Sequence, residues 1–295
     1  MIELKTTHNE AIERVVFSPD GELLAAVGTG SGLSMWSLTD RQSIRLRPAI
    51  GVISHATDDK NIGFSSDGSH LIGVAYGSLL RVIDRQTWSM RAIPAPGITT
   101  TTCVVADGSR VCMANARFIA CLDVAFGEKV WQHSWGPDDS LRPIISHPAS
   151  GQIVGIASPD RIDFRSALTG EIESQHHLIA PWNGLLAFSH SGKVVATGKG
   201  TRIHVYTMPS ESVITELRTG NRRHFTGIAF HPNDRVFATT SNDQTVRIWD
   251  ASNCKEITTF TWEIGEMRSI AFAPDGLRMA AGSSEGRVMV WDVDF

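Results

Sequence analysis

Short stretches of alternating apolar and polar residues recur along the chain, and residues 228–250 show the pattern most clearly. They predict three strands at 228–230, 235–241 and 245–249, separated by turns at 232–234 and 242–244. Alternation with a period of two residues is typical of a half-buried antiparallel meander. A meander this short cannot bury its faces alone, so we expect it to stack against similar units.

Such units are present along the chain. Residues 270–292 and 15–38 repeat the pattern closely, and weaker copies begin near residues 63, 103, 144 and 187. Each unit has a turn glycine, replaced once by aspartate, at Gly21, Gly68, Gly108, Gly151, Gly192, Asp234 and Gly276. The steps between these positions are 47, 40, 43, 41, 42 and 42 residues. A period of about 40–45 residues with four short strands per unit indicates a β-propeller.

The ends of the best units resemble a known family. Trp249-Asp250 and Trp291-Asp292 follow Pro-Asn-Asp and Pro-Asp-Gly turns, and in this the chain resembles the WD-repeat β-propellers. The resemblance is specific in the first, sixth and seventh units, and depends on period and turn chemistry in the others. It implies an all-β fold, with residues 1–295 forming a single seven-bladed propeller of four-stranded antiparallel blades.

The N-terminal segment is predicted to complete the last blade. Residues 2–7 match the position of 213–217 and 257–260, which are outer strands that belong to the preceding unit. The last unit ends just after its Trp-Asp pair and lacks such a strand. We therefore expect residues 2–7 to pair with the last blade, which removes the exposed edges of an open stack.

The resemblance also implies a structural role for several polar residues. WD-repeat blades often contain a buried hydrogen-bonded set that includes a Ser or Thr, an Asp and the Trp, because buried polar groups must be paired. The sixth unit matches this set at Thr239, Asp243 and Trp249. The seventh unit keeps Trp291 but has Ala281 and Glu285 at the other two positions.

The third and fourth units also show a weaker sequence resemblance to a second type of propeller. Residues 121–131 resemble the tryptophan-docking pattern of quinoprotein-type propellers, but Phe126 stands where a threonine normally precedes the glycine. Residues 166–173 keep the Thr-Gly pair without the tryptophan. We interpret Gly127 and Gly170 as turn glycines and Trp131 as a residue packed between blades, and we predict no quinone or other cofactor.

The four cysteines are Cys103, Cys112, Cys121 and Cys254. The first three are predicted on successive strands of the third unit, an arrangement that could bring a pair close together. We interpret them as reduced core thiols, and the absence of Cys-x-x-Cys or Cys/His clusters gives no sign of zinc. Reduced cysteines favour a cytoplasmic location.

Composition narrows the functional classes. Of the residues, 42% are hydrophobic and 20% charged, and the net charge of −4 argues against a nucleic-acid-binding surface. The sequence has no apolar run of about 18 residues, so it predicts no membrane span. The N-terminus has no secretory signal pattern. Gly-x-Ser-x-Gly, His-Glu-x-x-His and Walker motifs are missing from the sequence. We therefore predict a protein that is not an enzyme and holds no metal.

Binding is predicted on one face of the propeller. The loops that lead into each inner strand cluster around the central channel, and here they are rich in Trp and Arg, the residue types enriched at binding hot spots. The candidate partner-binding residues are Arg14, Trp135, Arg142, Trp182, Arg222, Arg223, His224, Trp262, Met267 and Arg268. The alternative for any one of them is packing between blades or simple solvation.

The predicted function is a non-catalytic scaffold that binds another protein or a peptide segment on this channel face. The ring is expected to be monomeric or a subunit of a larger assembly. One alternative is a propeller enzyme, either a hydrolase or lactonase or a quinone-dependent dehydrogenase, with its site at the channel mouth. Another is a propeller module of a longer parent protein without activity of its own.

Overall fold

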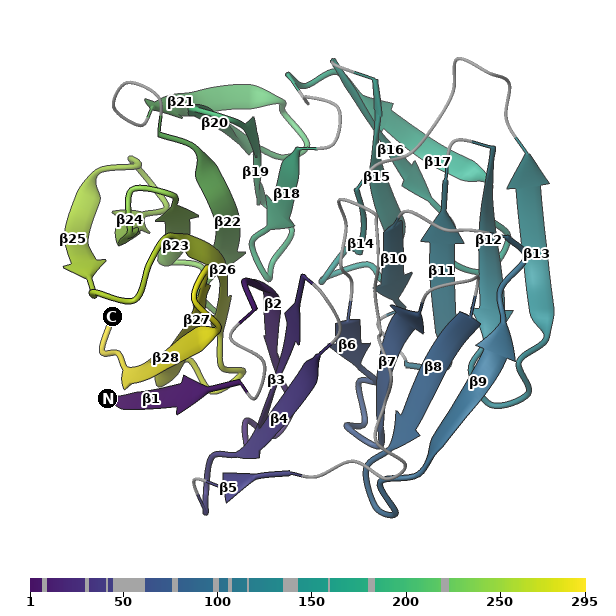
Figure 1. Ribbon diagram of the computed structural model, residues 1–295. Helices are drawn as coiled ribbons and strands as arrows, with labels where there is room; N and C mark the ends of the chain where they lie inside the picture. Colours follow the sequence, from purple (N-terminus) through teal and green to yellow (C-terminus); the bar gives the residue numbers. More distant parts are fainter. Residues whose placement is uncertain are drawn as a thin grey trace. The chain divides into compact units, whose positions relative to one another are not determined.

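The computed structural model of the chain describes residues 1–6, 10–29, 32–40, 42–44, 62–75, 79–97, 101–105, 108–115, 117–134, 143–158, 160–179, 184–218 and 223–295. Within these ranges the chain forms seven four-stranded antiparallel sheets and no helix (Figure 1). This confirms the all-β class and the four-stranded units. We call the sheets blades 1 to 7, in the chain order of their first strands from β2 onward.

The chain divides into two compact units, Met1–Arg45 with Leu185–Phe295, and Leu46–Gly184. The first unit contains blades 1, 5, 6 and 7. Their strands are, for blade 1, β2 (Ile12–Phe17), β3 (Leu23–Gly28), β4 (Leu33–Ser37) and β5 (Gln42–Ser43); for blade 5, β18 (Leu185–Phe188), β19 (Val194–Lys199), β20 (Arg202–Thr207) and β21 (Ser212–Arg218); for blade 6, β22 (Phe225–Phe230), β23 (Val236–Ser241), β24 (Thr245–Asp250) and β25 (Glu256–Thr261); and for blade 7, β26 (Met267–Phe272), β27 (Arg278–Ser283), β28 (Arg287–Asp292) and β1 (Ile2–Lys5).

The second unit contains blades 2, 3 and 4. Their strands are, for blade 2, β6 (Ile62–Phe64), β7 (His70–Ala75), β8 (Leu79–Asp84) and β9 (Met90–Pro94); for blade 3, β10 (Thr101–Val104), β11 (Arg110–Ala114), β12 (Phe118–Asp123) and β13 (Lys129–Ser134); and for blade 4, β14 (Ile144–Ser146), β15 (Ile153–Ser158), β16 (Arg161–Arg165) and β17 (Ile172–His176).

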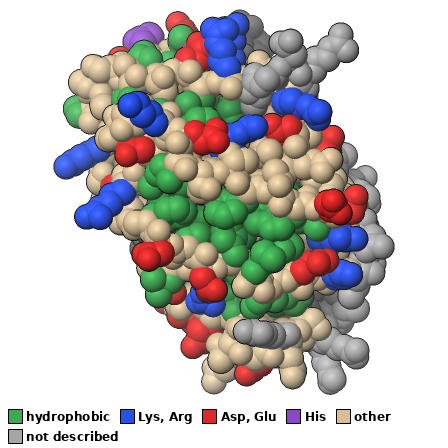
Figure 2. All heavy atoms as spheres, turned by 90° about the vertical axis from the view of Figure 1, so that its left-hand side faces the viewer, with side chains coloured by type: hydrophobic (Ala, Val, Ile, Leu, Met, Phe, Trp, Pro, Cys, Tyr) green, Lys and Arg blue, Asp and Glu red, His purple; other side chains and the backbone are tan. Residues whose placement is uncertain are grey.

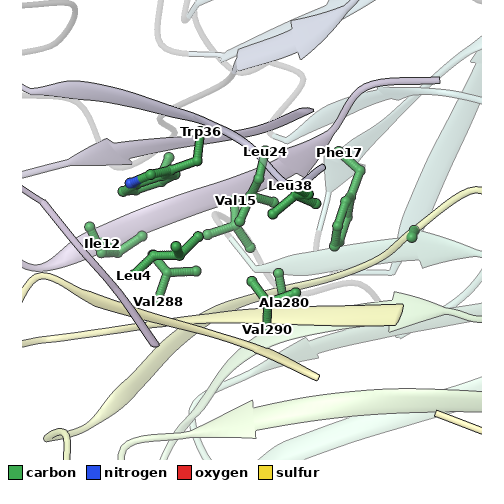
Figure 3. Close-up of a cluster of buried hydrophobic side chains, with 12 residues drawn as sticks. Leu4, Ile12, Val15, Phe17, Leu24, Trp36, Leu38, Ala280, Val288 and Val290 are labelled. Carbon is green, nitrogen blue, oxygen red and sulfur yellow. The ribbon is translucent and has the colours of Figure 1, made fainter. Parts of the chain in front are cut away.

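The N-terminal strand completes blade 7, as the sequence predicts. β1 pairs antiparallel with β28, with Ile2 opposite Val290 and Lys5 opposite Arg287 (Figure 1). Leu4 points into a buried apolar cluster between blades 7 and 1 (Figure 3). The two ends of the chain are therefore held together by a strand ladder and by shared core packing. The end of the predicted segment, residue 7, lies outside the described residues.

The turn residues that set the repeat period share one backbone conformation. All six glycines and Asp234 have φ between 61° and 73° in the left-handed region. Glycine adopts this region at no steric cost, and aspartate is among the few other residues that tolerate it. Asp234 gains compensating bonds, because its carboxylate accepts hydrogen bonds from the backbone N–H groups of His190 and Ser191, at 2.6 and 2.8 Å. The turn of blade 6 is thereby fastened to the turn of blade 5.

The second strand of blade 6 departs from the predicted half-buried alternation. All six residues of β23 are buried. Phe237 packs in a cluster with blade 5, and Ala238 packs in a cluster with blade 7. Both faces of the strand are therefore buried, and its buried residues include the polar Thr239, Thr240 and Ser241.

Trp131 connects blades 3 and 4 within the second unit. Its Nε1–H donates to the carbonyl of Ala167 at 3.1 Å. Gly170 has a φ of 78°, and a Cβ atom added there would lie 2.6 Å from the indole ring. These contacts confirm that Trp131 packs between blades and that Gly170 is a turn glycine.

Candidate functional site

Three inner strands lie side by side in the first unit. β26 contacts β22 on one side and β2 on the other (Figure 1). Their starts lie at the same level, because Thr226 at the second position of β22 bonds to Met267 at the first position of β26. On the other side, Gly282 is the register partner of Ser269 in β26. A Cβ atom added to Gly282 would lie 2.7 Å from the Cβ atom of Ile12, which starts β2.

Each of these three strands begins with a β-bulge. The register with the second strand shifts by one residue, and Glu13, Thr226 and Arg268 are the extra residues of these three bulges. A bulge bends the strand locally and re-aims side chains, and bulges are frequent beside functional sites. The loop edge of this unit therefore repeats one local distortion three times.

Thr226 shows how a bulge residue can connect neighbouring blades. Its hydroxyl donates to the carbonyl oxygen of Met267 at 2.7 Å, and lies 3.0 Å from the hydroxyl of Thr240. Since the first of these bonds joins blade 6 to blade 7, it fixes the spacing of their inner strands at the loop edge.

Four of the predicted binding residues lie at the starts of these strands with exposed or partly exposed side chains, and we call them the cationic rim. They are Arg14, Arg223, His224 and Arg268. Arg14 is the third residue of β2, Arg268 is the second residue of β26, and the other two immediately precede β22.

Local bonds hold parts of the cationic rim in place. The backbone N–H of His224 donates to the Asn242 side chain at 2.6 Å, and the N–H of Asn242 returns a bond to the His224 carbonyl at 3.0 Å. The Arg268 guanidinium lies 3.2 Å from the Glu266 carboxylate, with 37% of its side chain exposed. These cationic side chains are therefore presented from ordered backbone.

Two predicted residues have mainly structural surroundings. Met267 is completely buried in the core between blades 6 and 7, so its side chain offers no surface to a partner, which corrects its place among the exposed candidates. Trp262 is partly buried and stacks on Phe260 with ring centroids 5.8 Å apart. For Trp262, packing between blades is therefore the interpretation that applies. The other four candidates, Trp135, Arg142, Trp182 and Arg222, lie outside the described residues.

This architecture is similar to that of known proteins. The model of the family described as WD domain, G-beta repeat matches residues 214–250 and 254–292. Each match covers the fourth strand of one blade, blade 5 or 6, and the first three strands of the blade that follows. The crystal structure of the Myceliophteria thermophila Cps50 (Swd1) β-propeller domain superposes with a TM-score of 0.82 at 16% identity, covering 100% of both chains. The chain therefore has a β-propeller fold with two matched WD repeats, and it is similar to the WD-repeat β-propellers.

Curated relatives of this WD-repeat propeller extend the similarity at low identity. WD repeat-containing protein VIP3 of Arabidopsis thaliana is 24% identical over 59% of this chain and 56% of its own length. Actin-interacting protein 1 of Caenorhabditis elegans is 22% identical over 99% of this chain and 41% of its own length. The matched region thus spans about half of these relatives.

The described residues lack both a cluster of metal-binding side chains and a membrane-spanning helix. They contain no group of three or more His, Cys, Asp or Glu side chains suited to hold a metal ion. None of the described residues belongs to a helix with the length and apolar character that crossing a membrane requires. On the side that carries β25 and β28, charged side chains of both signs surround a hydrophobic area (Figure 2), so this face has no extended basic surface.

The bulge residues Glu13 and Thr226 are not among the residues predicted from the sequence. A signal for them exists in the spacing, because Phe225 and Ile228 are both apolar but three residues apart, which breaks the period of two. An odd spacing between apolar residues near the start of a strand is what a one-residue bulge produces.

Proposed function

We propose that this WD-repeat propeller is a non-catalytic scaffold that binds a protein or peptide segment on the face where loops lead into the inner strands. The observation that carries the proposal is the cationic rim, in which guanidinium and imidazole groups project from three adjacent inner strands that begin at one level. Arginine is enriched at binding hot spots because its planar fork makes several directed hydrogen bonds.

The expected mechanism is positional. The rim residues lie on or next to bulged strands. The Thr226–Met267 bond joins β22 to β26, and the His224–Asn242 bonds hold the start of β22 within blade 6. A surface ordered in advance loses less conformational entropy on binding than a mobile loop does. Partner carboxylates or backbone carbonyls are the groups that these donors suit best.

A charge-reversal experiment tests the rim. The variant Arg14→Glu/Arg223→Glu is compared with wild type by affinity purification and quantitative mass spectrometry from the cells that express the protein. We expect partners that copurify with wild type to fall by about tenfold or more with the variant, since losing a hot-spot side chain costs about 2 kcal/mol or more.

The matched control is Arg235→Glu, an exposed arginine after the turn at the opposite end of β22. It reverses one charge in blade 6, as Arg223→Glu does in the double variant, and is expected to keep the partners. Equal loss in both variants would mean that charge alone matters and would overturn the assignment to the rim. A stoichiometric metal or a quinone absorption band in the purified protein would instead favour the enzymatic alternative.

The assembly predictions extend the proposal. We propose that residues 1–295 act as one propeller domain in the cytoplasm, either alone or as one subunit of a larger complex. Size-exclusion chromatography with light scattering on the purified chain, and on the complexes recovered above, distinguishes the two states.

A further inference from the structure

Three cysteines form a continuous cross-strand row in blade 3. Cys103 of β10 lies opposite Cys112 of β11, and Cys112 lies opposite Cys121 of β12. All three are free thiols. The middle cysteine therefore has a sulfur neighbour on each side within a single sheet.

In four of the other blades the same row is built from alanine, valine, isoleucine and methionine. The row is the second register pair from the turn between the first and second strands of a blade, together with its partner on the third strand. The equivalent positions in blades 1, 5, 6 and 7 are Val16–Ala25–Met35, Ala187–Ala196–Val205, Ala229–Ala238–Ile248 and Ala271–Ala280–Val290. A propeller blade thus accepts ordinary apolar side chains at these three places. Packing alone does not require three thiols in one row.

The backbone pattern distinguishes the two cysteine pairs. The Asn115 N–H bonds to the Phe118 carbonyl across the hairpin, and antiparallel pairs alternate between bonded and non-bonded from there. Three steps along, Cys112 and Cys121 form a non-hydrogen-bonded pair, for which Cα atoms are about 4.5 Å apart and side chains are closest. Since a disulfide needs Cα atoms about 4.4–6.8 Å apart, this pair has suitable spacing.

The side chains agree with the backbone. The Sγ atoms of Cys112 and Cys121 are 3.1 Å apart, and both residues are completely buried. Cys103 is partly exposed, and its thiol is within hydrogen-bonding reach of Cys112. Burial, together with the neighbouring thiols, raises the pKa of the Cys112 thiol well above its usual range. The partly exposed Cys103 is therefore the place where an oxidant can first reach the row.

We propose that this cysteine row is an oxidative modification site, in which Cys103 reacts with a hydroperoxide and the oxidation passes inward to a Cys112–Cys121 disulfide. The proposal is independent of the binding function of the rim. It concerns a different blade and a different class of reactant, a small hydroperoxide.

Each step balances. The Cys103 thiolate attacks a peroxide oxygen, forms an S–O bond and breaks the O–O bond, giving the sulfenic acid and an alcohol or water. Cys112 sulfur then attacks the Cys103 sulfur, and its thiol proton leaves with the hydroxyl group as water. Cys121 finally attacks Cys112 by thiol–disulfide exchange, which forms the Cys112–Cys121 bond and returns Cys103 as a thiol.

The test treats the folded protein with hydrogen peroxide and follows its intact mass, with peptide mapping under non-reducing conditions after alkylation. We expect a loss of two hydrogen atoms, with the disulfide between Cys112 and Cys121 and an alkylated Cys103. Cys103→Ala is expected to slow this reaction by about tenfold or more, because the two remaining thiols of the row are completely buried. Cys121→Val is expected to stop the reaction at a Cys103–Cys112 disulfide.

These variants copy residues that sibling blades already have at the same positions, so the blade is expected to fold with them. Cys254→Ala, which removes the thiol in blade 6, is the matched control and should react like wild type. Stable addition of oxygen atoms to Cys103 without loss of two hydrogens would overturn the proposal. Unchanged disulfide formation in Cys103→Ala would overturn the relay, and a disulfide that forms only in denaturant would overturn the site.

Discussion

Blades 6 and 7 each place a tryptophan at the same position of the third strand, yet surround it differently. In blade 6 the Nε1–H of Trp249 donates to the Thr239 hydroxyl at 2.9 Å. In blade 7 the equivalent of Thr239 is Ala281, and the indole N–H of Trp291 has no hydrogen-bond partner among the described residues although the side chain is 6% exposed. Trp291 instead packs against Trp262, with ring centroids 4.8 Å apart, and against Phe260.

The tryptophan position of the third strand is therefore stabilised in two different ways. Blade 6 uses the Trp249–Thr239 hydrogen bond. In the turn before the same strand, Asp243 separately accepts bonds from Thr245 and, at 2.7 Å, from Arg247. Blade 7 uses aromatic contacts, and its nearest ion pair, Glu285 with Arg287 at 3.9 Å, is exposed at the surface. Aromatic pairs contribute about 0.5–1.5 kcal/mol, but an unpaired buried N–H costs about 1–3 kcal/mol. Blade 7 therefore retains an unmet bond that blade 6 satisfies.

The largest expected effect comes from breaking the blade 6 hydrogen bond at Thr239. Thr239→Val keeps the shape but removes the acceptor, so Trp249 is left with the same unpaired N–H as Trp291. We expect the free energy of unfolding to fall by about 1–3 kcal/mol. Urea unfolding followed by tryptophan fluorescence measures the change.

Thr261→Val provides the control for that substitution. Thr261 is exposed at the end of β25 in the same blade, and its change is expected to stay within about 0.5 kcal/mol. If both variants lose the same stability, the Thr239–Trp249 bond does not distinguish the two blades.

A somewhat smaller effect is expected at Asp243, and it depends on pH. Burial alone would raise the pKa of this carboxyl, but hydrogen bonds from Thr245 and Arg247 outweigh it and lower the pKa below the ordinary value. A lowered folded-state pKa means that the stabilisation is complete above about pH 4, where the unfolded chain also ionises, and is lost as pH falls through the folded value. Asp243→Asn should therefore cost about 1–2 kcal/mol at pH 7 and progressively less below pH 4.

The corresponding substitution in blade 7 sharpens the contrast. Glu285→Gln changes a side chain that is 54% exposed and is expected to alter stability by less than about 0.5 kcal/mol. Unfolding free energies of both variants and of wild type between pH 3 and pH 7 separate the two blades. A pH-independent difference between Asp243→Asn and wild type would contradict the role of the charged carboxylate.

Much of the fold follows from the sequence because it depends on local chemistry. The turn residues from Gly21 to Gly276 need a left-handed backbone, and this requirement marks the period directly. The last unit lacks an outer strand in the sequence, and residues 2–7 match that position. Together these two features predicted the β1–β28 ladder. The predicted start of the first strand of blade 6 was late by three residues, at 228 instead of Phe225, because the bulge at Thr226 interrupts the alternation.

The candidate site was less predictable because exposure depends on neighbouring blades. Arg223 and Arg268 have exposed or partly exposed side chains, as expected for a rim. Met267 is next to Arg268 in sequence but faces the core, since successive side chains of a strand point to opposite faces. Likewise, the ring partners of Trp262 come from β25 and β28, which no local pattern around residue 262 reveals.

The smallest expected effect repairs blade 7 instead of damaging blade 6. Ala281→Ser places a hydroxyl where blade 6 has Thr239, and adds a single oxygen atom, so it is the least crowded way to offer Trp291 an acceptor. We expect the free energy of unfolding to rise by about 0.5–1 kcal/mol, the usual net contribution of one hydrogen bond. Ala280→Ser, the neighbouring buried alanine on the same strand, is the control and should lose stability, because its hydroxyl enters the apolar cluster between blades 7 and 1. Equal losses in both variants would mean that the surroundings of Trp291 are too tightly packed for an acceptor, and that aromatic packing in blade 7 excludes the hydrogen bond instead of merely replacing it.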